Sequence, residues 1–560
     1  MQRLDLPTVP EAWHDSHEFD TRAKCWPGTR ERVVSDLVKW TEGDSTKSML
    51  WLNGPMGTGK STVAITVTKK LLRDGRLLAS FFFLKRGGTE RNRLSRLFPT
   101  LAQQMAIAIP QFRDALQKTL DGLSKEEIEI KSLEWQFETL IMTPLKVVDT
   151  ARLGSLRNVL IIDALDECDE LACVDKEPDD RLLDILHWLS KLGNSGIPPL
   201  RIILTSRSDP HVRKAIRLRS LIQPLDLDSR DLLDETKVDV GTFIRGKLNR
   251  IAERRNFRSW PAPADIERLI ESANKPEPLF IYAATFFLFI EGKPEQPVNP
   301  KKQLSKWLAE TAASTSRLGQ IYKPVLDRAL GSPEHEDYDV DEHKQLVLFL
   351  GALCLFEWPM TQEAVARLLR FHPDDVGHWI ASLHAVLDID DMEKTIRLRH
   401  KSFNDFLLQS TSAEYYVDAT QTHTELAQLC ISRMQDSLKR DICSVRKLDI
   451  IGEDIKDDLV EAHIPDELNY ACRYWVHHLV RGNGRSLVNA WEFLEEHFLH
   501  WLEAMSLLSR VSEAVQAVAA LLDLSQVSPS DLCSVQPSTD LPFRNARHPS
   551  RSSSFFWRKP

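Results

Sequence analysis

Short apolar runs alternate with helical patterns along the first half of the chain. Most of the runs are continuous in apolar residues, which is typical of parallel strands covered on both faces. They lie at residues 48–53, 78–84, 158–163, 201–206 and 220–224. Helical spacing appears at residues 30–41, before the first run, in the segment that opens at Ser61 shortly after that run, and at 94–120. Strands that alternate with helices predict a parallel α/β sheet with a ligand at the carboxyl ends of its strands.

From about residue 238 the strand pattern stops and helical patterns follow one another. Helices are predicted at residues 240–251, 264–273, 278–291, 302–310, 324–330, 345–356, 361–369 and 374–384, with an acidic loop at 332–342. Two short β-like runs, 385–389 and 395–399, come next. Helices followed by a small hairpin are typical of a winged helix. Most such units bind DNA, but this one is not strongly basic, and winged helices also serve as lids.

These patterns predict a P-loop α/β domain followed by an all-α domain, a winged helix and further helices. No period of 20–50 residues indicates a repeat array near the C-terminus. The final segment is rich in Ser, Pro and Arg and cannot build a core, so we expect it to be disordered. The predicted boundaries are 1–47 (lead-in), 48–230 (P-loop domain), 231–331 (helical domain), 343–410 (winged helix), 411–530 (C-terminal helices) and 531–560 (basic tail).

Composition narrows the class of protein. A chain of 560 residues exceeds one ordinary core, and 42% hydrophobic with 27% charged residues is usual for a globular protein. The net charge of −9 makes nucleic acid an improbable partner. The eight cysteines lack metal-ligand spacing, and the N-terminus is not a secretory signal. The longest apolar run, 279–290, is too short to span a bilayer, so we expect a cytoplasmic protein.

The first apolar run leads into a glycine-rich loop that matches G-x-x-x-x-G-K-[ST] and opens a helix. Glycines allow backbone N–H groups to turn towards phosphates, and the helix N-terminus adds partial positive charge. Lys60 is expected to reach the β- and γ-phosphates, and the Ser61 hydroxyl to bind Mg²⁺. The predicted phosphate site comprises Gly54, Pro55, Met56, Gly57, Thr58, Gly59, Lys60, Ser61 and Thr62.

Two later strands also end in polar residues. Residues 158–163 run into Asp163 and an acidic cluster, the Walker-B pattern, in which a carboxylate at the strand end holds Mg²⁺ through water. Asp163 is the metal candidate and Glu167 the candidate base, whereas Asp169 and Glu170 fit a solvated loop. Arg207 ends the next strand, where it is either a sensor of the γ-phosphate or an ordinary surface residue.

Together these segments resemble NACHT-domain proteins of the STAND class (signal transduction ATPases with numerous domains), particularly the fungal ones with a nephrocystin-3-like N-terminal domain. The resemblance runs from about residue 20 to about residue 409. It rests on LNGPMGTGKST (52–62), LIIDALDECDE (160–170), ILTSRSDPHV (203–212), LFIYAATFF (279–287) and IRLRHKSFNDFLL (396–408), and CWPGTRERV (25–33) is similar to the family's lead-in.

The resemblance implies the roles assigned above to the P-loop, the Walker-B carboxylates and the strand-end arginine. It also implies that Thr29 and Arg30 lie near the nucleotide base. His400 is similar to a winged-helix histidine that contacts the β-phosphate of ADP in relatives and holds the closed state. We expect no effector domain before residue 20 and no repeats after the helices, which leaves the signal and the output of the protein undetermined.

The choice of base can be examined in the sequence. Residues 236–239 (TKVD) fit the guanine-reading string [NT]KxD, but they follow a polar stretch and open a helix instead of closing an apolar strand. We therefore interpret the match as chance. ATP and ADP are favoured as ligands, and GTP stays possible.

The sequence thus predicts a nucleotide-dependent switch that is closed with ADP, opens on exchange for ATP and assembles into a homo-oligomer with partners still unknown. Hydrolysis would be slow and would serve as a reset, so whether the protein counts as an enzyme stays open. One alternative is a scaffold or protein-interaction module that holds nucleotide without turnover. A DNA-binding regulator that uses the winged helix is a weaker alternative.

Overall fold

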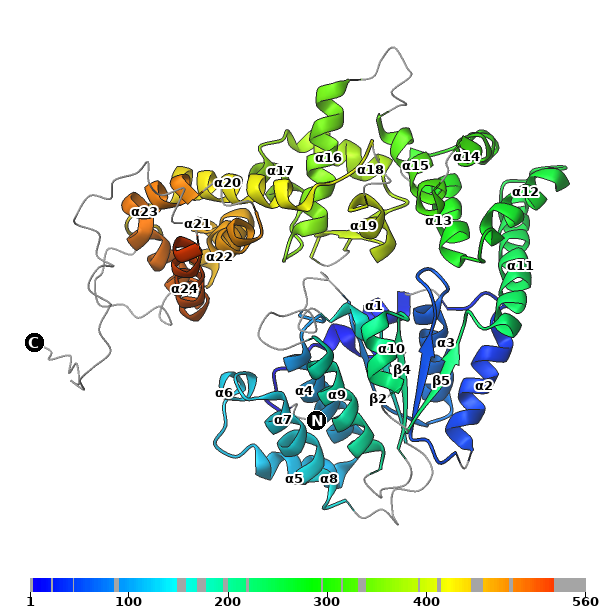
Figure 1. The fold of residues 1–560 in the computed structure, drawn as a ribbon, viewed down its shortest axis with the longest axis horizontal. Helices are drawn as coiled ribbons and strands as arrows, with labels where there is room; N and C mark the ends of the chain where they lie inside the picture. Colours follow the sequence, from blue (N-terminus) through cyan, green and yellow to red (C-terminus); the bar gives the residue numbers. More distant parts are fainter. Residues whose placement is uncertain are drawn as a thin grey trace, which may run out of the picture. The chain divides into compact units, whose positions relative to one another are not determined.

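The computed structural model describes most of the chain (Figure 1). The chain divides into two compact units, Met1–Thr422 and His423–Pro560. The described residues are 4–21, 24–43, 45–84, 90–148, 158–168, 178–194, 200–217, 221–293, 296–313, 316–330, 339–390, 393–409, 414–444, 457–482 and 487–527.

A five-stranded parallel sheet forms the centre of the P-loop domain, in the order β2-β3-β4-β1-β5. Its strands are β1 (Met49–Asn53), β2 (Leu77–Phe82), β3 (Val159–Asp163), β4 (Arg201–Ser206) and β5 (Ile222–Asp226). The predicted parallel α/β sheet is confirmed, and the last strand begins two residues later than the predicted 220–224 run. Because β4 lies between β1 and β3, the end of β4 lies between the P-loop and the Walker-B carboxylate.

Alternate residues of each buried strand pack into different cores. Met49 and Trp51 of β1 lie in the core formed with α4 (Leu97–Ala108) and α9 (Pro178–Gly193). Leu50 and Leu52 face the opposite core, which is formed with α2 (Glu31–Glu42) and α3 (Lys60–Arg73). Both faces of the sheet are therefore covered, which explains why its strands are continuous apolar runs (Figure 1).

The helical stretch predicted over residues 94–120 is divided into several elements in the structure. A short 3-10 turn, η2 (Leu94–Arg96), leads into α4, and the segment then breaks at Ile109 before α5 (Pro110–Thr119). Pro110 has no N–H to continue the hydrogen bonds of α4, and it suits the first position of a new helix.

Several further elements of the P-loop domain were not predicted. Within the lead-in lie η1 (Pro10–Ala12) and α1 (His17–Thr21), and α10 (Pro210–Arg217) follows β4. Between α5 and β3 lie α6 (Lys125–Glu129), α7 (Leu133–Gln136), the π-helix η3 (Phe137–Met142) and α8 (Thr143–Leu145); η6 (Leu165–Glu167) follows β3.

Helices follow the sheet, as predicted, although all of the next five except α13 are longer than expected. They are α11 (Arg230–Arg254), α12 (Pro263–Asn274), α13 (Phe280–Glu291), α14 (Pro300–Ala313) and α15 (Arg317–Leu330), with a small hairpin of β6 (Gly292–Lys293) and β7 (Gln296–Pro297) after α13. The predicted start of a helix at 324 is wrong, because Pro324 lies inside α15. The start of α11 lies at Arg230 instead of residue 240, since buried Leu232 and Thr236 extend its apolar face.

Three helices and a hairpin then give the order of elements expected for a winged helix. They are α16 (Val340–Leu355), α17 (Gln362–Leu369), α18 (Pro373–Ser382), β8 (Leu387–Ile389) and β9 (Ile396–Leu398), and α19 (Lys401–Leu407) follows. The start of α16 falls inside the predicted acidic loop, because the Asp339 side chain caps it by accepting the N–H groups of residues 341 and 342.

The second unit is helical, as predicted. Its helices are α20 (Ala419–Ser437, which begins before the unit boundary), α21 (Asp457–His463), α22 (Asp466–Arg481), α23 (Leu487–Leu507) and α24 (Val511–Val527). Trp475 and Trp501 meet edge-on in its core. The predicted tail, 531–560, lies outside the described residues, as do Asp169 and Glu170. No described helix is both long enough and apolar enough to cross a membrane.

Candidate functional site

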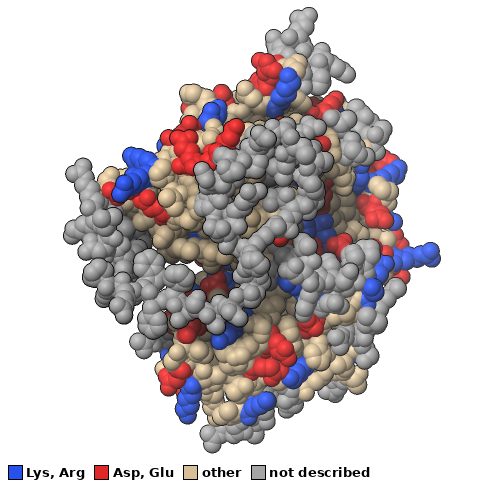
Figure 2. All heavy atoms as spheres, turned by 60° about the vertical axis from the view of Figure 1, so that its left-hand side comes forward, with Lys and Arg blue, Asp and Glu red and all other residues tan. Residues whose placement is uncertain are grey.

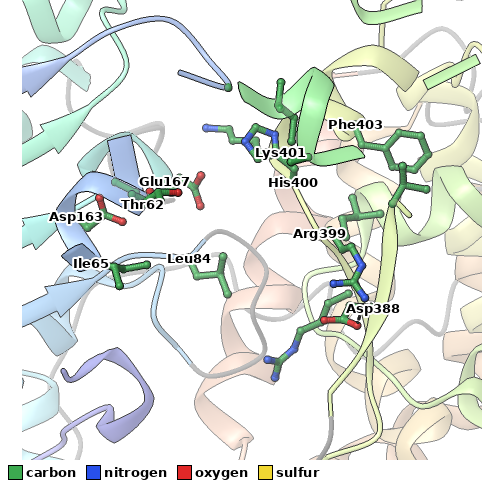
Figure 3. A pocket seen from close by; sticks show the side chains of 18 of the residues that line it. Thr62, Ile65, Leu84, Asp163, Glu167, Asp388, Arg399, His400, Lys401 and Phe403 are labelled. Carbon is green, nitrogen blue, oxygen red and sulfur yellow. Dashed lines mark hydrogen bonds and ion pairs between the residues drawn. The ribbon is translucent and has the colours of Figure 1, made fainter. Parts of the chain in front are cut away.

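A cavity of about 1270 Å³ lies at the carboxyl ends of β1, β3 and β4. The sheet side of its lining contributes the P-loop and the ends of β3 and β4. The opposite side comes from α19 and the β8–β9 hairpin. Figure 3 shows Asp163, Glu167 and Thr62 on one side, with His400 and Lys401 facing them from the other. The cavity lining brings together Met56, Gly57, Gly59, Lys60, Ser61, Thr62, Asp163, Glu167, Arg207 and His400.

The P-loop is held in shape by two glycines and by a contact from α13. Gly57 and Gly59 have φ angles of +76° and +90°, a region that favours glycine. The backbone N–H of Ile281 donates to the Gly57 carbonyl at 3.2 Å. A Cβ on Gly57 would lie 2.3 Å from the Ile281 Cγ2 atom, so no larger residue fits there. The first turn of α13 thus fixes the loop at its most crowded point.

Lys60 lies at the start of α3, where its ammonium group caps the loop. The Nζ atom donates to the carbonyl oxygens of Gly54 at 2.8 Å and of Pro55 at 2.9 Å. The pKa of Lys60 is lowered to about 8, mainly by burial. The charge of Arg207 also lowers it, while Asp166 and the Walker-B carboxylates oppose the shift. A buried cation of this kind is stabilised when an anion enters the cavity.

Asp163 ends β3 and is 1% exposed. The Thr205 hydroxyl of the neighbouring β4 donates to Asp163 Oδ1 at 2.5 Å and accepts the N–H of Ala164 at 2.9 Å. Ala164 adopts a left-handed conformation (φ +56°), which turns the chain into η6 and brings Glu167 to the cavity. The structure therefore places both Walker-B carboxylates on the lining, next to the start of α3.

Arg207, just after β4, is bound by two carboxylates. Its backbone N–H donates to Asp166 Oδ1 at 3.0 Å, its Nε lies 3.3 Å from Asp166 Oδ2, and its Nη1 donates to Asp405 Oδ2 at 2.8 Å. Burial lowers the pKa of Arg207, but the hydrogen bond and charge of Asp405, followed by the charge of Asp166, raise it overall. The sequence gave no sign that Asp405 would contact Arg207. It also did not indicate which residue of the acidic cluster after β3 would do so.

His400 is the N-cap of α19 and lines the same cavity as Lys60. Its Nδ1 accepts the backbone N–H of Ser402 at 3.1 Å, so in the neutral ring the proton is on Nε2. The pKa of His400 is lowered to about 4. Burial is the main cause, and the positive charges of Arg207 and Lys60 add to it. The Ser402 hydroxyl, in turn, is hydrogen-bonded to the buried Tyr322 of α15. His400 is therefore a neutral, oriented donor at neutral pH.

The lead-in residues Thr29 and Arg30 are buried and are not among the described residues that line the cavity. The Arg30 guanidinium donates to the carbonyl of Thr58 at 2.8 Å and to the hydroxyl of Thr236 at 2.7 Å. Its backbone N–H donates to Asp239 Oδ2 at 2.9 Å. The two ends of the TKVD string thus hold Arg30, which agrees with our interpretation that its match to a guanine-reading motif is chance. The predicted site residues Gly54, Pro55 and Thr58 also lie behind the described lining.

The residues present fit a nucleoside phosphate with Mg²⁺. The cations Lys60 and Arg207 and the donor His400 converge on one cavity, with a hydroxyl (Ser61) and a carboxylate (Asp163) beside them. The Oδ1 atom of Asn404, a buried residue on the same lining, has no hydrogen-bond partner among the described residues. Phosphate oxygens would pair with the cations, and an ordered water or metal ligand would satisfy the remaining acceptors.

Comparisons with known proteins give the same assignment for the first domain. Residues 28–207 match the family model described as nephrocystin 3, N-terminal. Over 539 residues the chain is 24% identical to the vegetative incompatibility protein HET-E-1 of Podospora anserina, a match that covers 89% of this chain and 36% of the relative. The chain therefore spans about a third of the length of that relative.

Two solved structures show weaker likeness. One is a signal transduction ATPase with numerous domains and a tetratricopeptide repeat sensor from Pyrococcus horikoshii (14% identity, 92% of this chain and 66% of the other, TM-score 0.39). The other is AMPPCP-bound DnaA from Aquifex aeolicus (14% identity, 64% and 88%, TM-score 0.25). At these TM-scores the likeness carries no argument about function.

Proposed function

The chain is a NACHT-type P-loop protein of the STAND class, with residues 28–207 as its nephrocystin 3 N-terminal-type domain, and from this premise we propose that it is a signalling switch driven by ATP and ADP. In this proposal ADP with Mg²⁺ holds the closed state, exchange for ATP opens the chain, and the open form assembles with further copies. Slow hydrolysis returns it to the closed state.

One observation carries the proposal: the phosphate-binding loop and α19 line the same cavity. A ligand bound to Lys60 therefore lies in a cavity that His400 also lines, although His400 is more than 300 residues away in the sequence. A ligand shifts a conformational equilibrium only if it interacts differently with the two states. His400 can make such a differential contact, because its distance from the P-loop depends on the position of α19.

The roles of the other residues follow from their positions. The P-loop and Lys60 bind phosphate oxygens, and the Ser61 hydroxyl and Asp163 would hold Mg²⁺, which would neutralise charge on the phosphates. Glu167 can orient the attacking water, and Arg207 can pair with the terminal phosphate. The neutral His400 would donate its Nε2 proton to a β-phosphate oxygen. The bound base is proposed to be adenine, with guanine as the alternative.

The first test is the nucleotide itself. Mass spectrometry of the purified protein should find ADP or ATP, and Lys60→Ala should abolish binding of a fluorescent ATP analogue, because the phosphates lose their closest cation. Lys70→Ala is the matched control, since Lys70 is exposed on the same helix. If Lys60→Ala binds as tightly as the wild type, the P-loop assignment is wrong.

The variant Glu167→Gln distinguishes the switch proposal from the alternative in which the protein holds nucleotide without hydrolysing it. This change keeps shape and hydrogen-bonding reach but removes the group that orients water, so it should leave affinity unchanged and slow single-turnover hydrolysis by about 100-fold or more. Asp163→Asn should instead weaken Mg²⁺-dependent binding. If neither the wild type nor Glu167→Gln hydrolyses ATP, the scaffold interpretation is favoured.

The DNA-binding alternative is disfavoured by the charges of the hairpin. Arg397 pairs with Asp390 at 2.9 Å and with Glu393 at 3.1 Å, and Arg399 pairs with Asp388 at 2.6 Å. On the face drawn in Figure 2, basic and acidic side chains are interspersed among the residues shown in colour. A groove-reading hairpin needs arginines that are available to phosphates.

A further inference from the structure

Four charged residues connect the two sides of the cavity. Arg207 and Asp166 belong to the sheet side, and Lys401 and Asp405 belong to α19. Arg207 Nη1 donates to Asp405 at 2.8 Å, and Lys401 Nζ lies 3.6 Å from Asp166 Oδ2. Each side therefore contributes one cation and one carboxylate, and both pairs join α19 to the sheet side.

The two carboxylates that contact Arg207 differ in how firmly they are placed. Asp166 is 6% exposed and is bound by the backbone N–H of Arg207 as well as by its side chain. Asp405 is 28% exposed, and its bond to Arg207 depends on α19 lying where it does. The Asp405 carboxylate is thus the partner that Arg207 can exchange without any change in the sheet.

Arg207 lies close enough to Lys60 for the two charges to affect each other, and both line the cavity. An anion that extends beyond the P-loop cation would meet the guanidinium next. The terminal phosphate of ATP is such an anion, and a guanidinium can bind two of its oxygens as it binds the two oxygens of a carboxylate. ADP has no group at that position.

We propose that Asp405 sets the preference of the closed form for ADP over ATP, by competing with the γ-phosphate for Arg207. This inference rests on the proposed function and adds a residue to it. While Asp405 is bound, Arg207 is neutralised from the α19 side and ADP fits without disturbing the pair. ATP must take Arg207 from Asp405, which also breaks one of the two charge pairs that hold α19 at the sheet.

The central experiment compares equilibrium affinities of Asp405→Asn and the wild type for Mg²⁺-ADP and for a non-hydrolysable Mg²⁺-ATP analogue, by calorimetry. The ratio of ATP-analogue affinity to ADP affinity should rise about three- to tenfold in Asp405→Asn. The expected change is modest because Asp405 is partly exposed and the pair is screened by solvent. Asp388→Asn is the matched control, because Asp388 faces the same cavity but pairs with Arg399, and its ratio should stay that of the wild type.

A double-mutant cycle tests whether the effect passes through Arg207. In an Arg207→Gln background, Asp405→Asn should produce no further change in the ratio. The inference is overturned if Asp405→Asn leaves the ratio unchanged, or if it shifts the ratio equally in the presence and absence of Arg207. Asp405→Ser, which also removes the carboxylate, replaces Asp405→Asn if the asparagine variant has a lower melting temperature than the wild type.

The wild type separates failure of this inference from failure of the proposed function. If the wild type binds neither nucleotide, both fall together. If it binds both, and Lys60→Ala binds neither, the switch proposal is supported and the affinity ratio alone decides the role of Asp405.

Discussion

Two arginines, Arg30 in the lead-in and Arg207 after β4, each join the P-loop domain to a helix that lies far away in the sequence. Arg30 is 4% exposed and bonds to a backbone carbonyl and a hydroxyl, with the Phe280 ring 5.1 Å from its guanidinium carbon. Arg207 has a side chain that is 19% exposed and bonds to two carboxylates. Both carry the same charge, but their partners differ in kind.

The difference indicates which contact is permanent and which can exchange. Nothing that enters the cavity can replace the Thr58 carbonyl and the Thr236 hydroxyl, because they lie behind its lining. A phosphate can replace the Asp405 carboxylate, since it is also an anion whose oxygens accept hydrogen bonds from a guanidinium, and it approaches from the cavity. The N-terminal part of α11 is therefore fixed to the P-loop, while α19 is held by contacts that compete with a ligand.

The largest expected effect comes from Arg30→Met. It removes two buried hydrogen bonds and leaves the Thr58 carbonyl without its donor, so the free energy of unfolding should fall by about 3 kcal/mol. Denaturant titration followed by tryptophan fluorescence measures the change. Arg32→Met is the control, because Arg32 lies in the first turn of α2, the helix that Arg30 precedes, and its side chain is 55% exposed. If both variants lose the same stability, Arg30 is not the fixed contact described above.

His400→Ala should alter the exchangeable side without altering stability to this extent. Loss of a hydrogen bond to a charged oxygen, about 1.5–3 kcal/mol, should weaken ADP binding roughly ten- to a hundredfold and speed ADP release. Stopped-flow release of labelled ADP, together with light scattering for the assembled fraction, checks both effects. A variant that keeps ADP as tightly as the wild type and stays monomeric would leave His400 as a packing residue.

The smallest expected effect is a pH dependence of ADP binding that comes from Lys60. Burial lowers the pKa of this residue to about 8. Above pH 8 the amine of the free protein is neutral, so ADP affinity should fall by up to about tenfold per pH unit. The unfolded chain binds more protons than the folded one between pH 8 and about 10.4, so the Lys60 contribution to stability should rise with pH over that window. Lys60→Arg, which stays charged, should lose the pH dependence of binding. Equal slopes in both proteins would contradict this assignment.

The sequence was sufficient to predict the elements that carry the chemistry. The glycine spacing of the P-loop, the apolar run that ends in Asp163 and the strand that ends at Arg207 each follow from local constraints, because a buried parallel strand must be apolar and a phosphate loop needs glycine. The helices after the sheet were predicted in type, but Pro324 inside α15 and the break before Pro110 were not, since packing decides whether a proline begins a helix or is tolerated within it.

Only the tertiary structure decided which of these residues meet. The strand order places β4 between β1 and β3, and no local pattern reports that order. The position of α19 decides that Asp405 and not another acidic residue reaches Arg207, and that His400 is neutral with its proton on Nε2. These properties depend on burial and on charges contributed by residues hundreds of positions apart, because electrostatic interactions follow distance in space and not in sequence.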